Sequence, residues 1–177
     1  MTTTAVIYHS GYGHAQRVAQ FVADGAQAQL IAIDADGNIS EADWAALDAA
    51  DAIVFGSPTY MGMVSWQFKK FADASSKRWF SGAWKDKVAG GFTISGSPSG
   101  DKLSTIQYFI TLAMQHGMVW VGQPAMNDGN INRIGSNSGV MAQVGPTSPA
   151  ADIPQGDLDT AKAYGERVRL LAQRMGA

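Results

Sequence analysis

Three short polar segments carry the residue types that could hold a ligand. The first, His9–Ala15 (HSGYGHA), has two glycines that allow a tight turn and a serine hydroxyl, and it leads into a helical pattern. The N–H groups at a helix N-terminus favour an anion, and no Asp or Glu occurs from Thr2 through Val22. The lysine of a triphosphate-binding loop and the glycine spacing of a dinucleotide-binding loop are absent. The segment therefore predicts a phosphate site, with an ordinary strand–helix turn as the alternative.

The other two segments are suited to a flat ring. Gly56–Met63 (GSPTYMGM) places a tyrosine and two methionines in a loop, where they could cover a ring or else the protein core. Ser95–Asp101 (SGSPSGD) is small and polar, so its backbone N–H groups could approach an electron-rich ring edge. Together, the three segments predict a ligand with a phosphate at one end and an aromatic ring at the other.

Several other chemistries are excluded or disfavoured. The chain has no cysteine, which rules out disulfides, thiolate metal sites and cysteine nucleophiles. The three histidines lack the spacing of a zinc motif, so we expect no metal site; His14 is placed near the ligand, and His116 ends a helix where a cation is favoured. Pro98 stands at the centre of the GSPSG sequence, which therefore is no serine nucleophile elbow.

Composition limits the class of protein further. With 177 residues, 46% of them hydrophobic and 16% charged, the chain is predicted to form a single domain over residues 1–177. A net charge of −2 gives no electrostatic reason to expect nucleic acid as a partner. We also expect no membrane span and a cytoplasmic location, because no apolar run approaches about 20 residues and the N-terminus is unlike a signal peptide.

Apolar runs and helical patterns alternate along the chain. Strands are predicted at 4–8, 30–33, 52–56, 88–94 and 118–121, and helices at about 14–28, from Ser40 onward, 64–76, 103–116 and 157–175. Ser40 and Asp43 match a loose capping box, and Asp157 is predicted to cap the last helix. Residues 122–155 are glycine- and proline-rich and indicate a long loop. The alternation predicts a doubly wound parallel sheet that binds its ligand beyond the strand ends, at the switch between strands one and three.

Placed in this order, the motifs resemble a known family. Tyr8–His14, Gly56–Gly62 and Phe92–Ser97 are similar to the ligand loops of flavodoxin-like FMN proteins, and above all of the tryptophan-repressor-binding-protein-like NAD(P)H:quinone oxidoreductases. Further matches are Arg78–Trp84, His116–Val119 and Ala163–Val168. The resemblance implies a flavodoxin-like α/β fold, with a five-stranded parallel sheet of order 2-1-3-4-5 and helices on both faces.

The resemblance also implies non-covalently bound FMN. Its phosphate would meet the first loop, its ring would meet the other two, and Gln115 stands where the family has a flavin-contacting histidine. The cofactor-binding residues implied are Ser10, Gly11, Tyr12, Gly13, His14, Ala15, Pro58, Thr59, Tyr60, Met61, Gly62, Ile94, Ser95, Gly96, Ser97, Gly100 and Gln115. Tyr12, Tyr60 and Trp79 match positions near nicotinamide or substrate, with Trp79 usually reached from a neighbouring subunit.

The implied reaction is two-electron transfer from NADH or NADPH to a quinone or a similar flat acceptor. A homodimer or homotetramer is implied as well. Two other functions stay open from the residues: a flavodoxin-type electron carrier, and an FMN-binding regulatory protein with little turnover. Net charge bears on the carrier, because such proteins dock through strongly acidic surfaces, and here only residues 1–60 are strongly acidic, with seven acids and one base. Six bases between Lys69 and Lys87 could meet the 2′-phosphate of NADPH or could simply face solvent.

Overall fold

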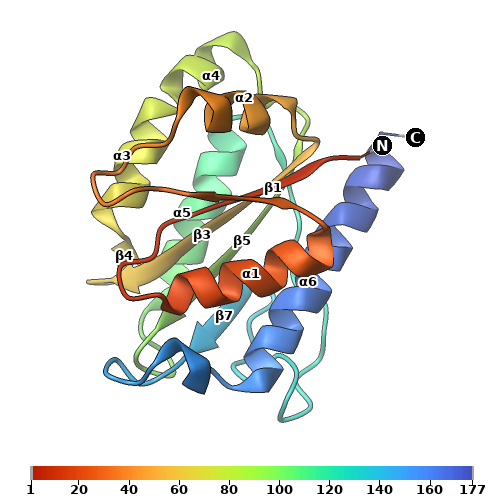
Figure 1. The fold of residues 1–177 in the computed structure, drawn as a ribbon. Helices are drawn as coiled ribbons and strands as arrows, with labels where there is room; N and C mark the ends of the chain where they lie inside the picture. The colour runs from red at the N-terminus through yellow and green to blue at the C-terminus, as the bar shows by residue number, and fades with distance from the viewer. Residues whose placement is uncertain (1, 177) are drawn as a thin grey trace.

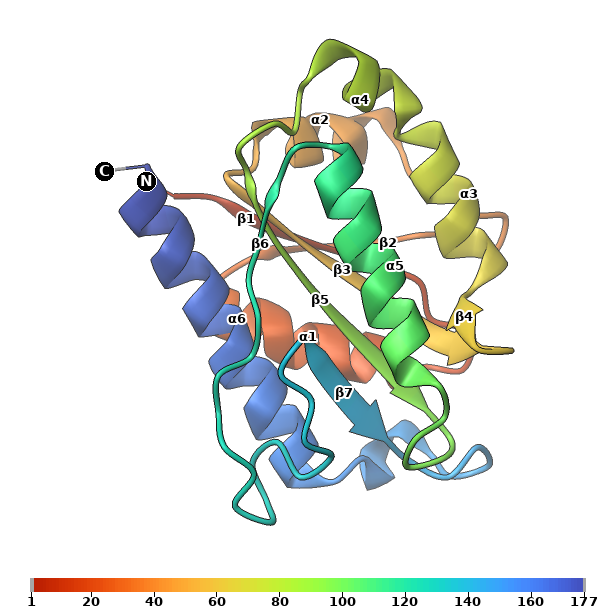
Figure 2. The ribbon, with the colours of Figure 1, turned by 180° about the vertical axis from the view of Figure 1, so that it is seen from behind.

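Short, uncharged, β-branched segments pair into a parallel sheet in the computed structural model, which describes residues 2–176. The sheet has the order β2-β1-β3-β5, with β6 and β7 following one another along the outer side of β5 (Figures 1 and 2), which confirms the predicted order. The strands are β1 (Thr4–Tyr8), β2 (Gln29–Ala32), β3 (Ala52–Tyr60), β5 (Val88–Ser95), β6 (Val119–Trp120) and β7 (Val140–Gln143), and β4 (Met63–Val64) is a short antiparallel partner of β3.

The fifth position of the sheet is filled in two pieces. β6 pairs with Val88 and Ala89 at the start of β5, the chain then leaves the sheet, and β7 returns to pair with Phe92–Ser95 at its end. The prediction of a loop throughout 122–155 is therefore wrong for β7 and for the short 3-10 helix η1 (Ala150–Asp152). A four-residue strand gives too short a pattern to recognise, because its pairing partner lies about fifty residues earlier. We call residues 121–139 the insertion.

Helices cover both faces of the sheet (Figures 1 and 2). α1 (His14–Ala26) and α6 (Gln155–Met175) pack on one face, and α2 (Glu41–Ala49), α3 (Trp66–Ala74) and α5 (Lys102–Gln115) pack on the other, with α4 (Ser76–Ser81) extending α3. The capping box is confirmed: Ser40 accepts the Asp43 N–H, and Asp43 accepts the Ser40 N–H. α1 and α6 cross closely at Gly25 and Gly165. A Cβ on either glycine would collide with a backbone carbonyl of the other helix.

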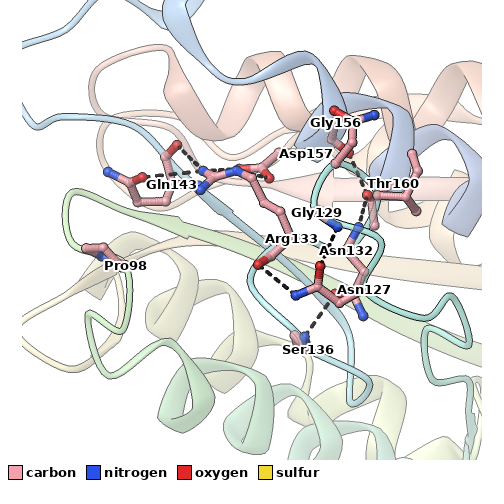
Figure 3. A network of polar contacts seen from close by, with 12 residues as sticks. Pro98, Asn127, Gly129, Asn132, Arg133, Ser136, Gln143, Gly156, Asp157 and Thr160 are labelled. Carbon is pink, nitrogen blue, oxygen red and sulfur yellow. Dashed lines mark hydrogen bonds and ion pairs between the residues drawn. The ribbon is translucent and has the colours of Figure 1, made fainter.

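A polar network ties the insertion to the rest of the fold (Figure 3). Arg133 forms an ion pair with Asp157, with 2.8 Å between Nε and Oδ1, and donates to the Gln143 carbonyl at 3.1 Å. The Gln143 N–H donates to Asp157 Oδ2 at 2.9 Å, and the Asn132 N–H donates to Thr160 Oγ1 at 2.9 Å. The prediction that Asp157 caps the last helix is therefore wrong, because α6 begins at Gln155 and the Asp157 carboxylate turns inward, with the residue only 2% exposed.

Two features bear on partners and metals. Among residues 2–176, no helix combines the length and the apolar character needed to cross a membrane. Within the same residues, no three histidine, aspartate or glutamate side chains gather closely enough to hold a metal ion.

Arg133→Met is expected to lower the free energy of unfolding by about 3–5 kcal/mol, because it leaves the Asp157 carboxylate buried without its cation. Asp157→Asn is expected to cost less, since Asn can still accept the Gln143 N–H and the Arg133 side chain is 27% exposed. Urea unfolding followed by circular dichroism measures both. Lys162→Met is the control, because its ion pair with Asp24 is exposed and such pairs contribute about 0–1 kcal/mol. If Arg133→Met lowers the free energy of unfolding no more than the control does, the Arg133–Asp157 ion pair does not stabilise the fold as proposed.

Candidate functional site

The site lies where the chain changes faces of the sheet. β1 is followed by α1 on one face, whereas β3 is followed through β4 by α3 on the other face, so a crevice opens beyond the strand ends between them. A cavity of about 430 Å³ occupies this position, within the range of about 300–1,000 Å³ found for small-molecule sites. It is lined by Ser10, Tyr12, His14, Ala15, Pro58, Thr59, Tyr60, Met61, Ile94, Ser95, Gly96, Val144 and Pro146.

One end of the cavity is the start of α1. Gly13 precedes the helix with a φ of 85°, a left-handed conformation that glycine adopts without strain. The first turn of α1 holds no acidic side chain, and Ser10 Oγ accepts the Gln16 N–H at 3.1 Å. His14 Nε2 donates to the Ser148 carbonyl at 2.7 Å, which joins the helix start to the segment after β7. The positive end of the helix dipole therefore faces the cavity with no carboxylate to neutralise it.

Two aromatic side chains also line the cavity. Tyr12 and Tyr60 meet edge to face, with ring centroids 6.2 Å apart and planes at 71°. Tyr60 packs over Gly11, where a Cβ would lie 2.8 Å from the phenol oxygen. Burial raises the pKa of Tyr60, and the neighbouring Tyr12 adds to the rise, so the phenol is neutral at physiological pH. Tyr12 is 79% exposed and Met61 is fully exposed, which leaves apolar surface at the mouth of the cavity.

Two sets of hydrogen bonds, of which the first is buried, hold residues of the cavity wall in place. Thr59 Oγ1 lies 2.8 Å from the hydroxyls of both Thr93 and Thr105, which joins β3 to β5 and α5. Gln143 Nε2 donates to the Gly96 carbonyl at 3.0 Å, so the loop after β5 is held by β7. Because Gln143 itself contacts Arg133 and Asp157, the insertion network reaches this wall.

The three predicted segments therefore converge, although Gly56–Tyr60, predicted as part of a loop, continues β3, and not every residue of the three segments meets the cavity. Eleven of the residues implied by the resemblance line it. Gly11, Gly13, Gly62, Ser97 and Gly100 belong to the same loops but are not among the lining residues. The left-handed φ values of Gly62 and Gly100, 79° and 55°, instead shape the turns that carry their neighbours.

Two implied residues lie elsewhere. Gln115 ends α5 and is exposed, and the chain then enters β6, which pairs with the amino end of β5, opposite to the cavity. Trp79 lies in α4, and Figure 2 shows α4 and β4 at opposite ends of α3. Neither Gln115 nor Trp79 therefore reaches the cavity of its own chain.

Sequence reasoning missed two lining residues, Val144 and Pro146. Both follow β7, in the stretch taken for a loop, and Pro146 packs so closely on the Ser95 turn that a Cβ on Gly96 would lie 3.2 Å from it. A weak signal is present, because Val140, Ala142 and Val144 alternate before a Gly-Pro turn, but this pattern is too short by itself to identify a strand.

Most of the basic cluster between Lys69 and Lys87 is engaged within the chain. Lys69 pairs with Asp73, and Arg78 pairs with Asp48. The ammonium groups of two further lysines donate to backbone carbonyls, Lys70 to Asp36 and Lys87 to Leu47, Asp48 and Ala50. These contacts favour the interpretation of the cluster as structural over that of a 2′-phosphate site.

His116 differs from its predicted role as a helix-end cation. It is buried, its Nε2 lies 2.9 Å from Ser75 Oγ, and its ring centroid lies 4.4 Å from that of Trp84. Burial lowers the pKa of His116, so the ring is neutral and takes part in core packing on the α3 face.

The chain is similar to known proteins in both sequence and structure. A flavodoxin named FldP from Pseudomonas aeruginosa is 49% identical over 184 aligned residues, with full coverage of both chains. An NAD(P)H dehydrogenase (quinone) from Syntrophus aciditrophicus is 33% identical over 67% of this chain and 70% of its own length. A crystal structure described as a flavodoxin, WrbA-like protein from Agrobacterium tumefaciens is 55% identical, with a TM-score of 0.84 and coverage of 98% of this chain and 99% of that one.

These similarities confirm the flavodoxin-like fold. The family model described as NADPH-dependent FMN reductase matches residues 10–132, a range that includes all of the predicted ligand loops except His9 and ends within the insertion. The chain belongs to the NADPH-dependent FMN reductase family of flavodoxin-like proteins.

Proposed function

We propose that the cavity holds FMN non-covalently, with its phosphate at Ser10–Ala15 and its ring between the other two loops. The observation that carries the proposal is a single cavity lined both by an acid-free helix N-terminus and by two aromatic side chains. A phosphate satisfies the first feature and a flat ring the second. Bound FMN supplies the capacity to accept and pass on two electrons.

The chain's own residues would bind the phosphate of FMN, cover its ring and orient it. Backbone N–H groups around Gly13 and the Ser10 hydroxyl would hold the phosphate without a lysine. Tyr60 and Met61 would lie along the ring, and the Ser95 turn would meet its edge. Tyr12, at 79% exposure, borders the open side, where a nicotinamide or a second flat molecule could stack. Protons would come from water or from the Tyr12 hydroxyl.

The reaction that we propose is oxidation of NADH or NADPH coupled to reduction of a quinone or similar flat acceptor. Two observations support it: the family itself, and the relative named NAD(P)H dehydrogenase (quinone). An exposed aromatic mouth suits successive binding of two flat substrates at one place, as a ping-pong reaction requires.

A second candidate is an electron carrier that docks to protein partners. It is favoured by the relative and the solved structure that are both named flavodoxin, at 49% and 55% identity. The net charge of −2 weighs against it, because carriers of this type dock through strongly acidic surfaces.

The purified protein is expected to be yellow, or to become so with added FMN, and to release FMN on heating. Anaerobic titration with NADH and with NADPH should bleach its visible absorption, and benzoquinone should then restore it. Steady turnover of either nucleotide with benzoquinone supports the enzyme. Bound FMN that exchanges electrons with a carrier protein but does not turn over NAD(P)H supports the carrier. Failure to bind FMN at all contradicts both functions.

Gly13→Asp is expected to weaken FMN binding by about tenfold or more relative to Gly13→Asn, because the carboxylate takes the position that favours the phosphate. The pair is matched: a side chain at this position meets open space, and both residues tolerate a left-handed φ. Quenching of flavin fluorescence gives both dissociation constants. Equal affinities would place the phosphate away from α1.

We further propose a homodimer or homotetramer in which Trp79 of one copy approaches the cavity of the next. Exposed apolar side chains at Tyr12, Met61, Trp79 and Phe80 support an apolar contact between copies.

Light scattering is expected to give a mass of two or four times 18.7 kDa. Trp79→Ala should raise KM for benzoquinone about three- to tenfold, the range expected for one aromatic contact, while Lys77→Ala, at an exposed residue of the same helix, serves as the control. A monomer with full activity rules out the shared site.

A further inference from the structure

Lys102 is the first residue of α5 and is 1% exposed, which is unusual for a lysine. Its ammonium group donates to Ser95 Oγ at 2.8 Å, to the Ser97 carbonyl at 2.9 Å and to the Pro98 carbonyl at 2.8 Å. All three acceptors belong to the turn that follows β5. Because Ser95 also lines the cavity, the Lys102 ammonium is hydrogen-bonded directly to the cavity wall.

The charge around Lys102 is only partly balanced. Arg133 and Asp157 form the neighbouring ion pair, so the three side chains together carry one net positive charge. Among the described residues, no carboxylate oxygen is found within 4.0 Å of the Lys102 ammonium. The ammonium is therefore held by neutral acceptors in the cavity wall, and its charge is free to act on a ligand there.

Keeping Lys102 charged is unfavourable for the folded state. Burial lowers its pKa from 10.5 to about 8, with Asp157 opposing the change and Arg133 adding to it. Below pH 8 the folded protein thus holds a charge that the unfolded chain accommodates more easily, and the contribution of Lys102 to stability rises only between pH 8 and 10.5. At pH 7 the side chain is still mostly protonated.

We propose that Lys102 is a positioning residue of the flavin site, which shapes the Ser95–Pro98 turn and keeps a positive charge behind the wall that meets the ring. Its charge would make the site bind FMN more tightly after reduction, when the ring has gained negative charge, than before it. The inference rests on the proposed function. It adds that the protein raises the midpoint potential of its flavin, which favours uptake of electrons from a nicotinamide.

Three variants separate the charge from packing. Lys102→Met keeps the apolar stem and removes the charge, and Lys102→Arg keeps the charge. Lys69→Met is the control, because it changes net charge equally at an exposed residue of α3 whose partner is Asp73. If circular dichroism shows that Lys102→Met does not fold, Lys102→Gln replaces it as the uncharged variant.

The measurement is the midpoint potential of bound FMN at pH 7, together with the dissociation constant of oxidised FMN. Lys102→Met is expected to reduce the preference for the reduced form about tenfold, which is about 30 mV for a two-electron couple. Lys102→Arg should stay within about threefold of the unaltered protein, and Lys69→Met should equal it. If Lys102→Met binds no FMN while Lys102→Arg does, the requirement for charge is also confirmed.

Three results would overturn the inference. These are equal potentials for Lys102→Met and Lys69→Met, loss of FMN binding in both Lys102→Met and Lys102→Arg, and failure of both uncharged variants to fold. The first two would show that Lys102 acts through packing alone, and the third would show that its ammonium serves folding and not the flavin. Failure of the unaltered protein to bind FMN would instead contradict the proposed function.

Discussion

The whole site depends on one topological constraint, the change of faces between β1 and β3. A crossover helix covers the face on which it returns, so consecutive strands with helices on the same face leave no opening at their carboxyl ends. Here α1 departs to one face and α3 to the other, and the gap between them cannot be closed by either helix. The backbone at this gap must be satisfied by a ligand, by water or by loops, and the three loops of the cavity are built around it.

The sequence predicts those parts of the structure that depend on local pattern. The strands β1, β3 and β5 are short apolar runs whose neighbours follow from the alternation with helices, and the Ser40–Asp43 capping box is a purely local signal. The glycines and small polar residues that follow these strands likewise indicate loops. These features do not require knowledge of distant contacts.

The parts that were missed depend on distant contacts. β7 is recognisable only beside β5, and Lys102 looks like an ordinary surface residue until the turn from Ser95 to Pro98 folds over it. The position of Gln115 is a different case. A crossover helix of 14 residues extends about 21 Å, so it returns the chain to the amino edge of the sheet, and its last residue lies away from the carboxyl edge of its own chain. Similarity to a family position concealed that geometry.

The two-part fifth strand has a consequence for how the protein is made. Val144 and Pro146 complete the cavity from a segment that follows the insertion, and Gln143 holds the Gly96 carbonyl from the same place. During synthesis, the loops after β1, β3 and β5 are all available before β7 has left the ribosome, yet they lack their fourth wall. The outer edge of β5 beside Phe92–Ser95 stays unpaired until then. The cavity therefore has all of its walls only after the segment that follows the insertion has been synthesised.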